Sequence, residues 1–419
     1  MSRSAFPAGA PAHGPRRAPG AGRALAALCV TVTTGYGVLF YAFPVLAPAI
    51  AADTAWSLAG VTAVFSAAQV VAGLSGIAVG RWVDARGPRP VMTAAAVLAV
   101  PAVAALGLAP SLWAFGAAWL VCGAAMAGLF YPPAFAALTR WYGEERVRAL
   151  TVLTLAAGFA STVFAPLTAV LEAALGWRGA YLALAGVLAA VVVPLHALAL
   201  TPPWDRAPRR RGPDGARRLP SAVRDPAFAA LAASLALGSF TVYAVVVNLV
   251  PLVEGRGFGT TAAAWALGVG GVGQVLGRLA YAPAERWLAP VPRTALVLLA
   301  CAATTALFAL VPGPLPLLLG IALLAGAARG VLTLLHATAV ADRWGTGDYA
   351  TLNGLLHTPL IFATALAPWA GAALAGPLGG HPAVFALMAA LAALGALLAL
   401  ATRTERTTDK DAHLWNTHT

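Results

Sequence analysis

The sequence predicts an all-α membrane protein with twelve transmembrane helices in two pseudo-symmetric bundles of six, and three observations support this. Of its 419 residues, 60% are hydrophobic and 10% are charged, whereas a soluble domain is about half apolar and about a quarter charged. Apolar runs of the roughly 20 residues that cross a bilayer recur along the chain. The two halves also resemble each other at an offset of about 200 residues.

The predicted spans follow one another with short polar breaks. The first apolar run follows a Pro-, Gly- and Arg-rich tail (1–23) and is longer than the roughly 7–15-residue core of a cleaved signal peptide, so we expect it to be retained. An Arg-rich linker (201–225) divides six spans in 24–200 from six in 226–402, and a polar tail (403–419) follows. The spans are 24–50, 58–80, 90–109, 112–138, 149–172, 179–200, 227–252, 261–283, 294–311, 315–341, 350–373 and 382–402.

The net charge of +12 reports orientation rather than nucleic-acid binding. The tails and the connections that follow even-numbered spans hold 23 of the 27 Lys and Arg residues, while the connections on the other side hold only Arg178 and Arg256. Positive loops stay in the cytoplasm, so both termini are expected there. The linker is expected to be a retention and lipid-headgroup segment, and no nucleic-acid partner is expected.

Four short sequence matches between the halves indicate a parallel repeat, which places a substrate site near the midplane between the halves. In order along the chain, the matches are Gly80-Arg81 with Gly277-Arg278, Arg140-Trp141 with Arg343-Trp344, Ala165-Pro166 with Ala367-Pro368, and Gly176 through Tyr181 with Gly380 through Phe385.

No cofactor, metal site or enzymatic activity is expected. Cys29, Cys122 and Cys301 lie in apolar runs, which indicates free thiols. The glycines of 268–273 fit a dinucleotide-binding pattern but lie inside a hydrophobic helix, where close helix packing is the more natural meaning. The same interpretation applies to the pairs Gly76/Gly80 and Gly326/Gly330. No catalytic acid or nucleophile and base pair lies at membrane depth.

The loop after the second span carries an acid and two arginines on a Gly-Pro turn: Gly80, Asp84, Arg86, Gly87 and Arg89. This segment resembles the loop signature of the major facilitator superfamily, G-x-x-x-D-R-x-G-R-K, with departures at Ala85 and Pro88. Its Gly-Pro-Arg form, Tyr41-Ala-Phe-Pro44 and Trp56-Ser57 are similar to the monocarboxylate and oxalate/formate transporter branch. The resemblance implies the major facilitator fold over 24–402 and a conformational latch in this loop; a plain positive loop is the alternative.

Two arginines lie inside predicted spans, at an insertion cost of about 2.5–3.5 kcal/mol each. Arg278 lies in the cytoplasmic half of the eighth span and Arg329 near the middle of the tenth, whereas all fifteen acids lie in tails, loops or span ends. A guanidinium matches a carboxylate or phosphate bidentately, so an anionic substrate explains both residues. Alternatively, Arg278 snorkels to the interface, and Arg329 caps broken-helix carbonyls or closes a loop.

The resemblance supports an anionic substrate but argues against the proton coupling of the monocarboxylate family. Arg278 matches the substrate-binding arginine of monocarboxylate and oxalate transporters. However, Val45 stands where the proton-coupled members have a lysine, and Gln274 where they have an aspartate. The sole lysine, Lys410, is in the C-terminal tail, so the eleventh-span lysine of the oxalate type is absent. This leaves uniport, anion exchange, or proton coupling through a histidine.

Polar and aromatic residues of the spans complete the candidate substrate site. Thr333 and His336 lie four and seven residues after Arg329, on one helical face, and His357 is the other deep histidine. Both histidines can titrate near neutrality or simply hydrogen-bond a neighbouring helix, and either role is open for the remaining candidates. These are Tyr36, Tyr41, Gln69, Tyr243, Asn248, Gln274 and Asn353.

The sequence therefore predicts a multi-pass transporter of a small organic anion, a mono- or dicarboxylate, that works by alternating access in a bacterial cytoplasmic membrane. Its expected partners are the anion, a proton or counter-anion, and the lipid bilayer. Two alternatives remain: an exporter of hydrophobic or amphipathic compounds, and a non-transporting sensor or assembly protein on the same fold.

Overall fold

The computed structural model describes residues 18–204, 221–344 and 349–402, and within them the chain is helical with short connections. Both tails up to residue 17 and from residue 403, and most of the expected linker, lie outside the described residues. The helices of the first half are α1 (Ala21–Tyr36), the π-helix η1 (Gly37–Tyr41), α2 (Ala42–Thr54), α3 (Leu58–Arg86), α4 (Pro88–Leu108), α5 (Leu112–Leu129), α6 (Tyr131–Tyr142), η2 (Gly143–Glu145), α7 (Arg146–Gly158), α8 (Ala160–Val187), η3 (Leu188–Val192) and α9 (Val193–Ala199).

The second half is more regular, with one long helix for each crossing. A short 3₁₀ turn, η4 (Ser221–Arg224), precedes it. Its helices are α10 (Pro226–Glu254), α11 (Thr260–Trp287), α12 (Pro290–Leu310), α13 (Leu315–Trp344), α14 (Tyr349–Ala375) and α15 (His381–Leu400).

Ten helical segments of the described chain are long and apolar enough to cross a membrane. One of them, Arg146–Ala199, is 54 residues long and contains a break at Gly176, whose backbone has φ 67° and ψ 169°. Splitting this segment at the break and adding α11 gives twelve crossings. The twelve spans predicted from the sequence are confirmed.

Helix starts follow ordinary capping chemistry. The Ser57 hydroxyl accepts from the Gly60 N–H at the start of α3, and the Asp225 carboxylate accepts from the Ala227 N–H at the start of α10. These side chains satisfy amides that have no carbonyl partner in the first helical turn. The predicted repeat is visible at Gly176 and Gly380, which both have positive φ and begin the last crossing of their half.

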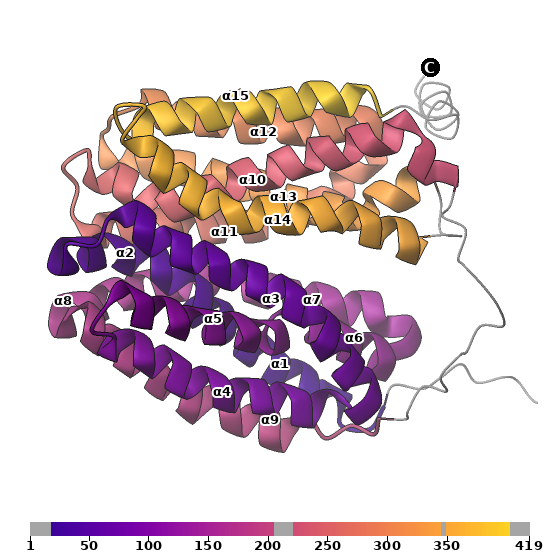
Figure 1. The fold of residues 1–419 in the computed structure, drawn as a ribbon. Helices are drawn as coiled ribbons and strands as arrows, with labels where there is room; N and C mark the ends of the chain where they lie inside the picture. The colour runs from indigo at the N-terminus through magenta and orange to yellow at the C-terminus, as the bar shows by residue number, and fades with distance from the viewer. Residues whose placement is uncertain (1–17, 205–220, 345–348, 403–419) are drawn as a thin grey trace, which may run out of the picture.

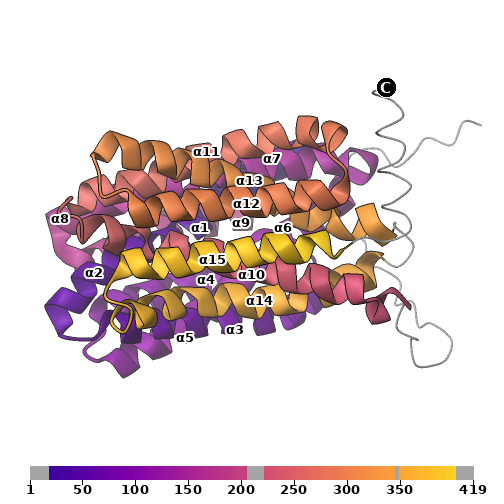
Figure 2. The same ribbon diagram turned by 90° about the horizontal axis from the view of Figure 1, so that it is seen from above.

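The helices α10–α15 pack together above α1–α9 in the view of Figure 1. Figure 2, turned by 90°, shows α12 and α15 side by side within the second half, where they are in contact. The start of α1 and the end of α15 lie at the same end of the molecule (Figure 1), which we call the termini side. The end that carries the connections from α2 to α3 and from α14 to α15 is the opposite side.

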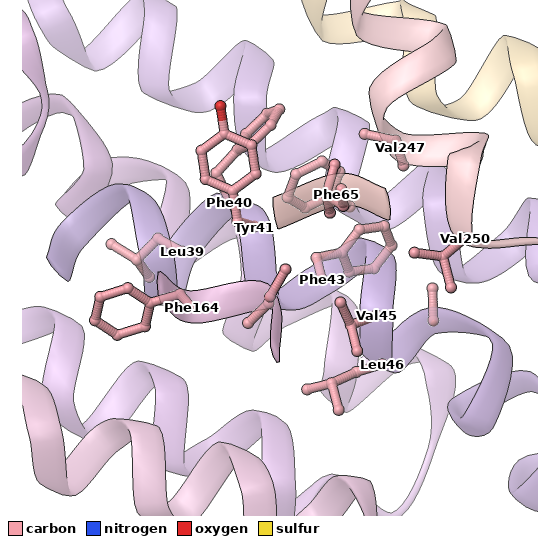
Figure 3. Close-up of a cluster of buried hydrophobic side chains, with 14 of the residues drawn as sticks. Leu39, Phe40, Tyr41, Phe43, Val45, Leu46, Phe65, Phe164, Val247 and Val250 are labelled. Atoms are coloured by element: carbon pink, nitrogen blue, oxygen red, sulfur yellow. The ribbon is translucent and has the colours of Figure 1, made fainter. Parts of the chain in front are cut away.

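The hydrophobic core joins the halves on the opposite side. One cluster of buried side chains contains Val45 and Leu46 of α2 together with Val247 and Val250 of α10 (Figure 3). On the termini side, each half has separate clusters formed from its own described residues. Apolar burial therefore holds the halves together mainly on the opposite side.

Helices α11 and α13 touch backbone to backbone, as the glycine patterns predicted. A Cβ added to Gly273 or Gly277 would collide with backbone atoms of α13, and one added to Gly326 or Gly330 with backbone atoms of α11. The same prediction is wrong for Gly76/Gly80, since a Cβ at either position would meet no atom within 4 Å. The spacing alone does not show whether another helix passes over that face.

Gly277→Val is expected to lower the free energy of unfolding by about 1–3 kcal/mol, because the new side chain would push α11 away from the Ala327 carbonyl of α13. The measurement is the thermal unfolding of the purified full chain in detergent. Gly320→Val is the matched control, because it lies on α13 with no atom within 4 Å of an added Cβ. Equal stability of the two variants would contradict the proposed packing role.

Candidate functional site

A cavity of about 110 Å³ lies between the halves near the middle of the bundle. The first half contributes Tyr36, Phe40 and Tyr41, which come from the end of α1 and from η1. The π-helical turn η1 widens the helix by one residue at this point. In Figure 3 the Tyr41 hydroxyl points away from the packed rings around it. The second half contributes residues of α10, α11 and α13.

Arg329 is the only cation among the described residues that line this cavity. One of its terminal nitrogens donates to the Gln274 side-chain oxygen at 3.3 Å and to the Gly270 carbonyl oxygen at 3.5 Å, while its Nε is buried without a partner. No carboxylate of the described residues pairs with it. The guanidinium is thus held in place by neutral groups and keeps its charge available for an anion.

Arg278 lies on α11 with 6% of its surface exposed and reaches across to the first half. Its guanidinium donates to the Thr154 carbonyl oxygen of α7, and its Nε is buried without a partner. An added Cβ on Gly158 would lie 3.2 Å from the same guanidinium, so the glycine makes room for it. Arg278 therefore does not snorkel here, and it connects the two halves through a main-chain acceptor.

Tyrosine side chains lie near both arginines. Tyr131 interacts electrostatically with Arg278, and Tyr243 interacts electrostatically with both Arg278 and Arg329. The Tyr36 and Tyr131 ring centroids are 4.9 Å apart. A phenol hydroxyl can donate to an anion or accept from an arginine. These tyrosines can therefore form hydrogen bonds both when an anion is bound and when the site is empty.

The prediction that Arg329, Thr333 and His336 share one face is confirmed, because all three line the cavity. The Ser239 hydroxyl lies 3.4 Å from His336 Nε2, and the His336 and His357 rings are 6.4 Å apart in an edge-on arrangement. His357 does not line the cavity and lies behind His336.

Of the two asparagine candidates, Asn248 does not line the cavity. The Asn248 side-chain amide donates to the Ala244 carbonyl and to the Pro368 carbonyl of α14, so it joins α10 to α14. Asn353 is in α14, and its side chain lies outside the described part of the structure. Asn248 thus has the alternative role considered in the sequence analysis, a hydrogen bond to a neighbouring helix.

A second cavity of about 490 Å³ adjoins the first, and the two share Tyr36, Phe40 and Tyr243. Its walls come from α3, α5 and α6 of the first half and from α14 of the second. Gln69 lines it, and so does Met126, the repeat counterpart of Arg329.

Comparison with known proteins identifies the fold. The sequence model of the Major Facilitator Superfamily matches residues 26–321. The chain belongs to the major facilitator superfamily. The match covers more than half of the chain and both sides of the linker. As a member of this superfamily, the protein is a membrane transporter rather than an enzyme, as the sequence predicted.

Three curated relatives share about a third of the aligned residues with the chain. Human monocarboxylate transporter 11 is 32% identical over 74% of the chain and 63% of its own length, and the mouse protein is 31% identical over 72% and 64%. An uncharacterized 38 kDa protein of Thermoproteus tenax is 31% identical over 76% of the chain and 79% of its own length. The chain thus spans slightly less than two thirds of the two monocarboxylate transporters.

Solved structures confirm the major facilitator fold. A bacterial homologue of the human lysosomal transporter Spinster, inward-facing and unoccupied, superposes with a TM-score of 0.69 at 17% identity, covering 92% of this chain and 94% of that one. The human organic anion transporter MFSD10 superposes with a TM-score of 0.65 at 19% identity, covering 91% and 100%.

The loop that carries the superfamily signature is fixed by a tryptophan that sequence reasoning missed. Trp204 packs on Gly87, which has φ +87°, and donates from its indole nitrogen to the Asp84 carbonyl at 3.3 Å. The Arg140 guanidinium lies 4.5 Å above the same ring. Trp204 follows the end of the sixth apolar run, and no motif pointed to it.

The charged groups of this loop are exposed and form no ion pair with described residues. Arg89 donates from Nε to the Ala197 carbonyl of α9 at 2.8 Å, within the first half, while Asp84 and Arg86 face solvent. Gly80 is in open space. The latch role therefore remains a proposal.

Proposed function

We propose that this transporter carries a small organic anion, a carboxylate, between its two halves by alternating access. The observation that carries the proposal is the Arg329 guanidinium, which faces an interdomain cavity with no carboxylate partner among the described residues. A carboxylate bound there would neutralise the cation and accept hydrogen bonds from the guanidinium and from nearby phenols. The similarity to the monocarboxylate transporters supports this substrate class.

In this proposal, Arg278 joins the substrate site to the movement of the halves. Its guanidinium holds the Thr154 carbonyl across the interface. Arrival of an anion near Tyr243, which interacts with both arginines, would offer Arg278 a charged acceptor in place of a neutral one. The charged acceptor forms the stronger hydrogen bond, so binding would release the contact with α7 and free the halves to move.

The proposed orientation places the termini side in the cytoplasm, which the distribution of basic residues favours, and the proposed membrane is the bacterial cytoplasmic membrane. The separate clusters on that side then correspond to an inward-facing state. In the outward-facing state, we propose that Asp84, Arg86 and Arg89 pair with the second half and hold the cytoplasmic side closed. His336, with His357 behind it, is the proposed proton carrier if transport is coupled, because Val45 and Gln274 occupy the coupling positions of the monocarboxylate family.

A thermal-shift screen of the purified full chain tests the proposed substrate class. Mono- and dicarboxylates are screened at two pH values, with tetraphenylphosphonium as an amphipathic cation for comparison. A carboxylate at 100 times its Kd should add about 2.7 kcal/mol of stability, whereas the cation should add none. Stabilisation by the cation alone would favour the exporter, which the apolar 490 Å³ cavity suggests as the second candidate. No shift with any compound would favour the sensor.

A further inference from the structure

Two neighbouring interdomain cavities have chemically different linings. Both are lined by Tyr36, Phe40 and Tyr243, so these three side chains stand at their junction. The smaller cavity, about 110 Å³, is the head compartment; the larger, about 490 Å³, is the tail compartment. Pockets for whole small molecules measure about 300–1,000 Å³, so the head compartment alone suits a headgroup or a very small anion.

Polar groups concentrate in the head compartment. Arg329, Gln274, Thr333, His336 and Ser239 all line it, and all belong to the second half. The cation has no carboxylate partner in the described chain. This end can therefore bind one negatively charged group through a bidentate contact.

The tail compartment is apolar over most of its wall. Ile77, Met126, Phe130 and Ile361 line it, and Gln69 and Thr364 are its non-aromatic polar side chains. Among the described residues, no charged group lines this compartment. A second carboxylate would lose its hydration there without gaining a cation, which is strongly unfavourable, whereas an alkyl or aromatic group gains free energy from leaving water.

We infer that the substrate is an amphipathic monocarboxylate, with its carboxylate on Arg329 and an alkyl or aryl tail in the tail compartment. Short carboxylates such as propionate bind weakly because they leave the tail compartment unfilled, and dicarboxylates such as succinate gain nothing from their second charge. This inference deepens the proposed function and rests on it, since it requires a carboxylate in the head compartment.

Gly76 gives the inference a specific test. It lines the tail compartment, and an added Cβ would meet no atom within 4 Å. Gly76→Phe should therefore occupy the space of the tail without displacing a helix. The matched control is Gly186→Phe, which makes the same change at an exposed position of α8 with no atom within 4 Å of an added Cβ.

The experiment measures the affinity of the full chain in nanodiscs for acetate, propionate, butyrate, hexanoate, 3-phenylpropionate and succinate. In the unmodified chain, affinity should rise by up to about fourfold per added methylene, and succinate should bind no more tightly than propionate. Gly76→Phe should lower the ratio of 3-phenylpropionate to propionate affinity by about tenfold or more, since about two methylene equivalents of burial are lost. Gly186→Phe should leave that ratio unchanged.

The possible outcomes separate the inference from the function on which it rests. Equal affinity along the series, tighter binding of succinate, or an unchanged ratio in Gly76→Phe would overturn the inference while leaving carboxylate transport intact. If no carboxylate of any length binds, the proposed function fails instead. If Gly76→Phe does not fold, the length series in the unmodified chain decides.

Discussion

Arg329→Gln is expected to reduce carboxylate affinity by at least about 30-fold. Truncating one partner of a buried, hydrogen-bonded charge pair costs about 2–5 kcal/mol, and each 1.4 kcal/mol is about tenfold. The glutamine keeps a hydrogen-bond donor in the cavity but removes the charge and the two-pronged geometry. The measurement is equilibrium binding of the tightest-binding carboxylate, together with its uptake into proteoliposomes.

Two further variants make this result specific. Arg329→Lys restores the charge without the fork, so its affinity should lie between those of the unmodified chain and Arg329→Gln. Arg224→Gln removes the same charge from an exposed position on the termini side and should bind normally. Normal binding by Arg329→Gln would show that the anion is held elsewhere.

Asp342→Asn is expected to lower the free energy of unfolding by about 3–5 kcal/mol. Asp342 forms an ion pair with Arg293, whose side chain is 3% exposed and whose Nε is buried without a partner. No other carboxylate in the described chain pairs with this arginine. Removal of the acid therefore leaves a buried cation without a counter-charge. Thermal or denaturant unfolding in detergent measures the change.

The double variant Arg293→Met with Asp342→Leu supplies the control. Replacing both partners by apolar residues of similar size removes the charge imbalance, and such replacements are neutral or stabilising in other proteins. Stability should therefore return toward that of the unmodified chain. A double variant as unstable as Asp342→Asn would mean that packing at α12 and α13, and not charge, explains the loss.

The twelve crossings could be predicted because bilayer thickness fixes the length of an apolar run and because charge separates the connections by side. The predicted fold is confirmed by the family match and by the solved structures. Arg278 and Arg329 could be recognised as candidates because inserting a cation at membrane depth costs free energy. Such a residue is therefore expected to have a functional role or a partner. Placing their partners requires the order in which helices pack around each other, which hydropathy does not contain.

The features of the site that could not be predicted from the sequence are contacts that depend on tertiary packing. Tyr131 of α6 interacts with Arg278 of α11 only because the two halves face each other here. Asn248 and Tyr243 lie five residues apart on α10, yet one packs against α14 and the other faces both cavities. The empty space beside Gly76 also arises from packing, because the same glycine spacing at 326 and 330 is filled by a neighbouring backbone.

The contact between Arg278 and the Thr154 carbonyl has a genetic consequence. The acceptor is part of the main chain, so every residue that keeps α7 helical presents the same oxygen. A scan of single substitutions would therefore score position 154 as permissive, although its carbonyl joins the halves. Sensitivity should emerge at Gly158, where an added Cβ would lie 2.7 Å from Val275 Cγ2 and 3.2 Å from the Arg278 guanidinium. Homologues could diverge freely at 154 without altering the contact.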